Sequence, residues 1–223
     1  MFIQNMINNE DFKYKFEKAI LVGSSGDLLN KESSDFINSF PVVIRMNDSP
    51  IYNFEKDVGN KTTIRIVNFK AIGNVLNPNF LKEFVNTEYL ILCTNNQNDR
   101  YKFQNLSKLF PKLKLYIFTP YAIEYNDKLF LKYTKRLRKQ SGSWITTGWM
   151  SLFFLINYVK EKHIIGFGGE YPNSKYHYYS KSNLTQKSYY IQHETSSNGH
   201  RFITEKDVFV KWIKEFNLIF HKL

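Results

Sequence analysis

The chain has 223 residues, with 31 Lys or Arg against 20 Asp or Glu, so its formal net charge is +11. An apolar fraction of 43% and an aromatic fraction of 17% exclude an intrinsically disordered chain. The single cysteine, Cys93, excludes an internal disulfide. We find no signal peptide and no apolar run of the roughly 18 residues that span a bilayer. We therefore expect one domain over residues 1–223 and a cytoplasmic location, with peripheral membrane association left open.

Short runs rich in β-branched and aromatic residues predict six strands. In chain order they cover Lys18–Val22, Val42–Met46, Thr63–Asn68, Tyr89–Cys93, Lys114–Thr119 and His163–Phe167. They lack clean alternation of polar and apolar residues, which is typical of parallel strands that are buried on both faces.

Longer segments between these strands predict the helices. They cover Pro78–Val85, Tyr121–Lys139, Thr147–Lys160 and Glu205–Phe216. Thr204 is the expected N-cap of the last helix. The polar segment Tyr171–Asn198 is interpreted as a long loop. This alternation predicts an α/β fold that binds its ligand beyond the C-terminal ends of the strands.

A turn of small residues, Gly23-Ser24-Ser25-Gly26, follows the first predicted strand. Backbone N–H groups in such a turn can approach a phosphate closely. The pattern is neither a G-x-G-x-x-G motif nor a Walker A loop. A tight turn between a strand and a helix explains it equally well.

The second predicted strand leads into a denser block, RMNDSPIYNFEKDVGNKTT, from Arg45 to Thr63. Single residues of this block have structural explanations. Arg45 can pair with Asp57 or Glu55, and Asn47 can cap a turn. The combination of these residues in one block is not explained by such separate structural roles.

The block resembles the large sialylmotif of glycosyltransferase family 29, the eukaryotic-type sialyltransferases. Ile145-Thr146-Thr147-Gly148, the apolar helix after it and Gly166-Phe167-Gly168 resemble the small sialylmotif. His177-Tyr178-Tyr179 matches the third motif, and His200 with Glu205 matches the final His-x4-Glu. The four motifs occur in the family's order from Leu21 to about Glu205, which covers most of the chain.

The resemblance implies a Rossmann-like α/β domain with a mostly parallel central sheet flanked by helices, the GT-A-like variant of sialyltransferases. It also implies an inverting, metal-independent transfer of sialic acid or a related keto sugar. The donor is CMP-sialic acid or CMP-Kdo, and the acceptor is a glycan or glycolipid hydroxyl. His200 is the implied general base, and His177 is implied at the donor phosphate. The implied donor-binding residues are Ser24, Ser25, Asn47, Trp144, Thr146, Thr147, Gly148 and Gly168.

Histidine suits both catalytic tasks near neutral pH. The structural alternatives are a helix cap for His200 and packing in an aromatic cluster for His177. His193-Glu194 lies close by in the sequence and matches no motif. No Asp-x-Asp occurs, so we expect no metal ion and no cofactor.

The chain departs from the family at several positions. Ser24 stands where the family has Asn, and Ile145 where it has Pro. By alignment, the two cysteines of the family's disulfide become Ala19 and Val159. The membrane anchor and stem of the Golgi enzymes are missing, so the chain resembles a minimal bacterial or viral catalytic domain.

Two other functions remain open. The net charge and the run of Lys132, Lys135, Arg136, Arg138 and Lys139 suit a module that binds nucleic acid or an anionic membrane. Helical spacing would place most of this run on one face, and a solvated helix face explains it as well. A catalytically silent relative is the third reading. The family resemblance favours a CMP-sugar as partner rather than nucleic acid.

Overall fold

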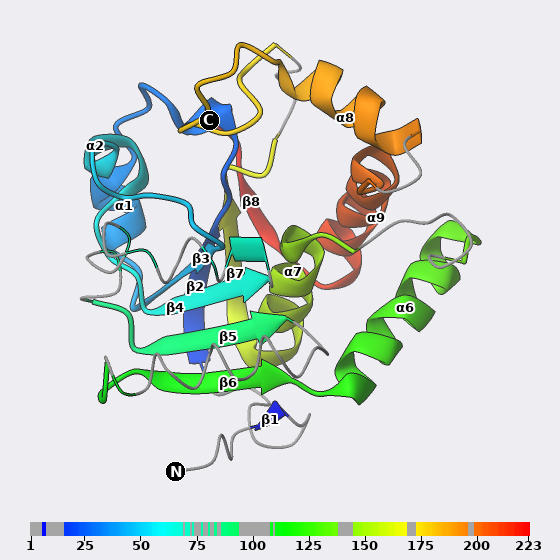
Figure 1. Cartoon of the computed structure of the whole chain (residues 1–223), viewed down its shortest axis with the longest axis horizontal. Helices are drawn as coiled ribbons and strands as arrows, with labels where there is room; N and C mark the ends of the chain where they lie inside the picture. Colours follow the sequence, from blue (N-terminus) through cyan, green and yellow to red (C-terminus); the bar gives the residue numbers. More distant parts are fainter. Residues whose placement is uncertain are drawn as a thin grey trace.

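The fold is described by a computed structural model, which covers residues 6–7, 16–68, 70–71, 73, 77, 80, 83, 86–93, 108, 110–137, 145–168, 173–195 and 199–223. An eight-stranded sheet with the strand order β1-β6-β5-β4-β3-β2-β7-β8 forms the centre (Figure 1). Every pairing in this sheet is parallel. The strands are β1 (Met6–Ile7), β2 (Phe16–Val22), β3 (Val42–Met46), β4 (Ile64–Asn68), β5 (Tyr89–Cys93), β6 (Lys114–Phe118), β7 (Val159–Ile165) and β8 (Ile219–His221).

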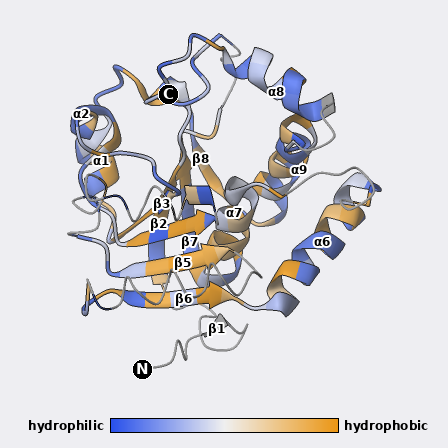
Figure 2. Ribbon diagram, viewed as in Figure 1, coloured by the Kyte–Doolittle hydropathy of each residue, from blue (hydrophilic) through white to orange (hydrophobic). Residues whose placement is uncertain are grey.

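Helices cover both faces of the sheet, as the buried runs predict. Along β2, Ala19 and Leu21 belong to one core cluster and Ile20 and Val22 to another. The first cluster includes residues of α6 (Pro120–Thr134), α7 (Thr147–Tyr158) and α9 (Phe202–Glu215), and the second includes α1 (Ser34–Asn38) and α2 (Glu55–Val58). Figure 2 shows apolar residues gathered along β5 and β6.

The predicted α/β class is confirmed, and most strands lie where the sequence places them. β3 and β5 match the predicted ranges at both ends. β7 begins at Val159, so His163 lies inside the strand and not at its start. The three residues of β8 and the two of β1 were not predicted, because such short strands carry no periodicity.

The helices differ more from the prediction. The segment interpreted as a loop contains α8 (Gln186–Thr195). Helix α9 begins at Phe202 with Arg201 as N-cap, so the expected N-cap Thr204 lies inside the first turn. Helix α6 ends at Thr134 because Lys135 takes a left-handed conformation, with φ of 60°. The basic run therefore does not continue on one helix face through Lys135, while residues 138–139 and most of Pro78–Val85 lie outside the described residues.

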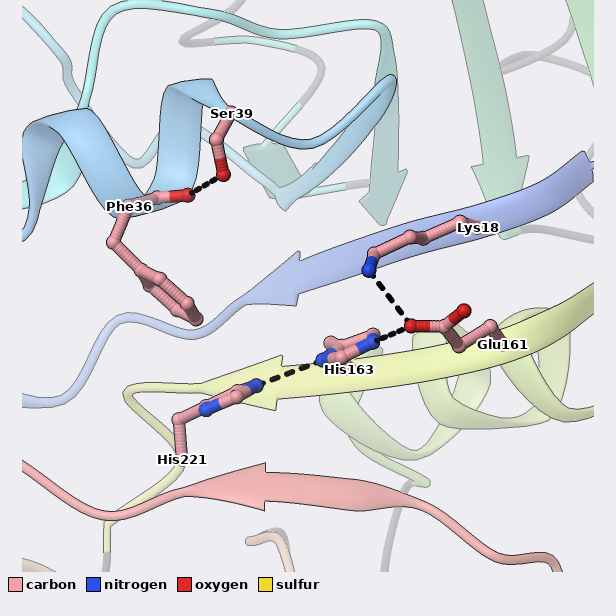
Figure 3. A network of polar contacts seen from close by, with 6 residues as sticks. All are labelled: Lys18, Phe36, Ser39, Glu161, His163 and His221. Carbon is pink, nitrogen blue, oxygen red and sulfur yellow. Dashed lines mark hydrogen bonds and ion pairs between the residues drawn. The ribbon is translucent and has the colours of Figure 1, made fainter.

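The edge of the sheet formed by β2, β7 and β8 carries a chain of polar contacts (Figure 3). Lys18 Nζ lies 2.8 Å from a carboxylate oxygen of Glu161, which lies 2.7 Å from His163 Nε2. His163 Nδ1 and His221 Nε2 are 2.8 Å apart. The rings of Phe40 and His163 meet edge to face at 4.7 Å. Since the three strands contribute one side chain or more each, the contacts hold the short β8 in register. Nearby, the Ser39 hydroxyl donates to the carbonyl of Phe36, whose ring also meets His221 edge to face.

The two positions of the family's disulfide lie in the same core cluster. Ala19 on β2 and Val159 on β7 are fully buried, and the two strands pair side by side. The register pairs Val159 with Phe16 and Ala19 with Lys162, so Ala19 and Val159 are not directly opposite each other, and their match to the family's disulfide stays a prediction. Among the residues that the structure describes, no helix has the length and apolar content that crossing a membrane requires.

Candidate active site

A cavity of about 210 Å³ opens at the C-terminal ends of the parallel strands. Its walls come from the turn after β2, the ends of β3, β4 and β7, the first turn of α7, and the starts of α8 and α9 with the segment before α8. This is the edge where α/β folds bind their ligands. Nine of the ten site residues predicted from the sequence line this cavity: Ser24, Ser25, Asn47, Thr146, Thr147, Gly148, Gly168, His177 and His200. The tenth, Trp144, lies outside the described residues.

The turn after β2 is packed too tightly for any side chain at its first position. Gly23 donates its N–H to Ile165 across the sheet at 2.8 Å. A Cβ atom on Gly23 would lie 1.9 Å from the carbonyl oxygen of Gly166. The hydroxyl groups of Ser24 and Ser49 are 2.7 Å apart. Ser24, which replaces the family's Asn, thus has its hydroxyl fixed by a residue of the neighbouring motif.

Asn47 follows β3 in a left-handed conformation with φ of 48°, which asparagine tolerates better than most residues. Its Oδ1 accepts the N–H of Asn68 at 3.1 Å, and this contact orients the side-chain amide. Arg65, fully buried on β4, donates to the carbonyls of Asn47 at 2.8 Å and Ser49 at 3.1 Å. The buried guanidinium of Arg65 therefore stabilises the turn at Asn47.

Arg45 forms hydrogen bonds with the segment 58–62 and not with an acidic side chain. Its guanidinium donates to the carbonyls of Val58, Gly59 and Lys61 and to the hydroxyl of Thr62. The structural alternative of an ion pair with Asp57 or Glu55 is not what Arg45 forms. The carboxylate of Asp57 instead accepts two backbone N–H groups, those of Lys31 and Glu32. The D-V-G-N-K-T part of the block is thus structural.

The first turn of α7 forms another wall. Thr146 is the N-cap, and its hydroxyl accepts the N–H of Trp149 at 3.0 Å. Asn68 donates to the hydroxyl of Thr147 at 3.0 Å. A helix N-terminus with free N–H groups and hydroxyls favours an anion.

Glu205, from α9, reaches the same helix start. Its carboxylate accepts the backbone N–H of Thr146 at 3.0 Å and also bonds to the Thr146 hydroxyl. Burial raises the pKa of Glu205 to about 8, against the lowering effect of these two hydrogen bonds. The group is therefore largely a neutral acid at pH 7, and it joins α9 to α7 at the cavity.

We expect Glu205 to make the free energy of unfolding fall as pH rises. Its carboxyl pKa is raised from 4.5 to about 8 on folding, so between these values the folded chain holds a proton that the unfolded chain has released. Stability is lost in this window by at most about 1.4 kcal/mol per pH unit. Glu205→Gln, which keeps the shape of the neutral acid, removes that loss.

The measurement is urea unfolding of both proteins at pH 6.5, 7 and 8. In this range folded His177 is neutral, because burial lowers its pKa from 6.5 to about 4, while the unfolded chain's His177 still titrates. That contribution is the same in both proteins, so the difference between their pH slopes reports Glu205. An equal pH slope in parent and Glu205→Gln contradicts the assignment.

His177 stacks on two aromatic rings. The ring of Tyr176 is 4.0 Å from it and that of Tyr179 is 4.9 Å from it, with interplanar angles of 30° and 19°. Burial lowers the pKa of His177 to about 4, so the imidazole is neutral at pH 7. His177 therefore packs in an aromatic cluster, as the structural alternative has it, and it also lines the cavity.

His200 directly precedes Arg201, the N-cap of α9, as the sequence predicts for a histidine near a helix N-terminus. Its ring meets that of Phe202 edge to face at 5.3 Å. Both residues line the cavity. The imidazole is therefore fixed in place by the start of α9.

Several lining residues were not predicted as part of the site. They are Met46, Asn68, Trp149, Leu152, Phe167, Tyr176, Tyr179, Tyr190, Phe202, Lys206, Phe209 and Trp212. Lys206 is exposed and adds a positive charge to the cavity wall. One sequence signal could have placed Lys206 near His200: it lies two residues after Thr204, the expected N-cap of this helix. In the part of the chain that the structure describes, no group of three or more His, Cys, Asp or Glu residues could hold a metal ion.

Comparison with known proteins gives a consistent result. The family model of glycosyltransferase family 29 (sialyltransferase) matches residues 2–215. A human alpha-N-acetyl-neuraminyl-2,3-beta-galactosyl-1,3-N-acetyl-galactosaminide alpha-2,6-sialyltransferase is 31% identical over 217 residues, which are 90% of this chain and 72% of that enzyme. A mouse alpha-N-acetylgalactosaminide alpha-2,6-sialyltransferase 6 is 30% identical over 235 residues, 96% of this chain and 70% of the relative.

These relatives correct one expectation. They are animal sialyltransferases of the Golgi, which are luminal enzymes. The cytoplasmic location expected from the sequence is therefore wrong. It was inferred from targeting signals that were not found, and such an absence says nothing about the compartment.

Two solved structures have the same fold. A mammalian sialyltransferase in complex with Gal-beta-1-3GalNAc-ortho-nitrophenol superposes with a TM-score of 0.64 and 20% identity, over 93% of this chain and 70% of that one. The Campylobacter jejuni sialyltransferase CstII in complex with CMP-3FNeuAc gives 0.54 and 20%, over 92% and 81%. Fold, motif order and sequence relatives agree, so the chain belongs to glycosyltransferase family 29, the sialyltransferases, and is a sialyltransferase-like, CMP-sugar-dependent glycosyltransferase.

Proposed function

We propose that residues 1–223 form one catalytic domain that transfers sialic acid, or a related keto sugar such as Kdo, from its CMP conjugate to a hydroxyl of a glycan or glycolipid. The observation that carries the proposal is the cavity itself. It gathers His177, His200 and seven donor-binding candidates at the C-terminal edge of a parallel sheet. These residues come from segments up to 176 positions apart, between Ser24 and His200.

The donor nucleotide binds between the turn after β2 and the start of α7. Ser24 and Ser25 border the phosphate, with Asn47 nearby at the end of β3. Thr147 and Gly148 present a hydroxyl and helix N-terminal N–H groups to the phosphate or ribose. Thr146, whose own N–H and hydroxyl bond to Glu205, completes this wall of the pocket. Gly168 lets the cytidine approach the backbone. Trp144 remains a proposed part of this pocket.

His200 acts as the general base. Its neutral imidazole accepts the proton of the acceptor hydroxyl while the acceptor oxygen bonds to the anomeric carbon of the sugar. The bond from that carbon to the phosphate oxygen breaks on the opposite face, and CMP leaves with the electron pair. One displacement without an enzyme nucleophile inverts the anomeric centre.

His177 hydrogen-bonds the departing phosphate. Its pKa of about 4 leaves a neutral ring at pH 7, which still has one N–H to donate. An adjacent phosphate anion favours the charged form and so raises that pKa. The leaving group gains stabilisation as its negative charge develops. The single phosphate of CMP makes a metal ion unnecessary for this step.

The acceptor is proposed to carry N-acetylgalactosamine. The name of the mouse relative gives an alpha-N-acetylgalactosaminide as acceptor, and that of the human relative an alpha-N-acetyl-neuraminyl-2,3-beta-galactosyl-1,3-N-acetyl-galactosaminide. The alternative of a nucleic-acid or membrane-binding module has less support, because α6 ends before its basic run forms a continuous helical face.

The proposal predicts that the purified chain hydrolyses CMP-Neu5Ac or CMP-Kdo without any acceptor. CMP release from each donor is measured in parallel, together with thermal stabilisation by CMP. At a hundredfold excess over its Kd, CMP should stabilise the fold by about 2.7 kcal/mol.

The two alternative functions, a catalytically silent relative and a binding module, predict different results in these assays. CMP stabilisation without hydrolysis of either donor indicates a silent relative. Affinity for nucleic acid that falls steeply with salt, without CMP stabilisation, indicates a binding module and overturns the proposal.

A further inference from the structure

Helix α8 is anchored at its two ends to two different parts of the cavity wall. Its first residue, Gln186, contacts the donor turn, and its residue Glu194 contacts the start of α9 beside His200. Figure 1 shows α8 beside α9, above the strand ends. The sequence of α8 has no apolar periodicity that would hold it there, and Ile191 is half exposed. Polar and stacking contacts therefore determine its place.

The first anchor is a buried amide. Gln186 is 3% exposed, and its Nε2 donates to the hydroxyl of Ser25 at 2.6 Å and also contacts that of Ser174. The hydroxyl of Ser25 in turn donates to Asp27 at 2.8 Å. The hydroxyl of Tyr190, one helical turn on, donates to Gln186 Oε1 at 3.1 Å. The start of α8 is thus tied to the turn that borders the donor phosphate.

The second anchor is a carboxylate at a helix N-terminus. Arg201 provides no side-chain cap for α9. Glu194 accepts the backbone N–H of Ile203 at 2.9 Å and that of Thr204 at 3.4 Å, and it bonds to the Thr204 hydroxyl. A negative charge suits this end of a helix. Arg201 Nη1 closes the contact by donating to the carbonyl of His193 at 3.0 Å.

Stacked rings brace the middle of the helix. Tyr189 stacks on Tyr176 at 3.6 Å and on His193 at 4.2 Å. Tyr176 is also the ring that stacks on His177. A shift of α8 would therefore move groups beside both catalytic histidines.

We infer that Glu194 is a positioning residue for His200. Glu194 belongs to α8 and its carboxylate caps α9, while Gln186, the first residue of α8, bonds to the donor turn. Glu194 thereby fixes the distance between the proposed base and the donor turn. This inference rests on the proposed function of His200. Glu194 does not touch the reacting groups. It acts through the first turn of α9, which begins two residues after His200.

The test compares Glu194→Ala, Glu194→Gln and Gln186→Ala with a matched control, Glu215→Ala. Glu215 also joins α9 to another helix, since it accepts the hydroxyl of Tyr133 at 2.6 Å, but at the far end of α9. The readouts are kcat and KM for sialic acid transfer from CMP-Neu5Ac, the Kd of CMP, and amide hydrogen exchange at Ile203 and Thr204.

Glu194→Ala should lower kcat about 10- to 100-fold, as small misplacements of a catalytic group do, with the Kd of CMP unchanged. Exchange at Ile203 and Thr204 should rise about tenfold. Glu194→Gln, which keeps one acceptor oxygen, should recover most of the lost kcat. Gln186→Ala should instead raise the Kd of CMP, and Glu215→Ala should leave kcat and Kd as in the parent.

Equal kcat values for Glu194→Ala and Glu215→Ala, in an active parent, overturn the inference and leave the proposed function standing. So does a Glu194→Ala effect confined to the Kd of CMP. An inactive parent instead removes the proposed function. In that case the exchange data decide whether Glu194 caps α9: unchanged protection at Ile203 and Thr204 overturns the inference.

Discussion

Replacing His200 by alanine is expected to lower kcat for sialic acid transfer by a factor of about 10² to 10⁴, the contribution of a positioned general base. The ring lies at the cavity wall, one residue before the N-cap of α9, where no other described histidine except His177 lines the cavity. Burial lowers the pKa of His177 to about 4, so its imidazole is too weak a base to take over the proton. Affinity for CMP should change by less than about twofold, because the base serves the acceptor.

The control for this variant is His221→Ala. His221 is also half-buried, but it lies on β8 against His163, away from the cavity. Steady-state kinetics and calorimetric titration with CMP measure the two effects separately. Transfer by His200→Ala at the parent rate would show that another group accepts the proton.

Gly23→Ala is expected to destabilise the fold by about 3 kcal/mol or more and to abolish CMP binding. The added methyl group would lie 1.9 Å from the carbonyl oxygen of Gly166 and 2.8 Å from the ring of Phe167. A backbone oxygen cannot rotate away as a side chain can, so β2 and β7 must separate at this point. Gly23 also donates its N–H to Ile165 across the same two strands, and that hydrogen bond would be lost.

Gly73→Ala is the matched control, since among the described residues, its chain neighbours and local helix backbone aside, no atom lies within 4 Å of a Cβ atom there. Alanine at that exposed helical position should leave stability unchanged or raise it by up to about 1 kcal/mol. Urea unfolding and thermal shift with CMP measure both variants. A Gly23→Ala protein with parent stability and parent CMP affinity would contradict the close packing of the donor turn.

The strands that the sequence predicts best are those whose side chains are buried on both faces. β3 (VVIRM) and β5 (YLILC) are short runs of mostly apolar residues, and their burial on both faces makes them recognisable. The same logic places α7, whose residues are almost all buried. The motifs then place most of the site, because all but His177-Tyr178-Tyr179 lie at the end of a strand or near the start of a helix, and parallel strands bring these ends together.

What the sequence does not predict depends on contacts between distant residues. Helix α8 has no apolar stripe, and buried Gln186, Glu194 and stacked tyrosines hold it in place. The N-cap of α9 was assigned to Thr204 on local pattern, yet the carboxylate that caps the helix comes from Glu194, nine residues before Ile203. The raised pKa of Glu205 likewise arises from burial against α7, which no local pattern reveals.

The central claim is that the cavity at the strand ends holds the donor nucleotide between the turn after β2 and the two histidines. A crystal structure of the complex with CMP tests it most directly. The account predicts the phosphate within hydrogen-bond distance of Ser24 or Ser25 and of His177, with His200 on the open side where an acceptor enters. CMP bound outside this cavity, or inside it with its phosphate away from both the turn and His177, would contradict the account.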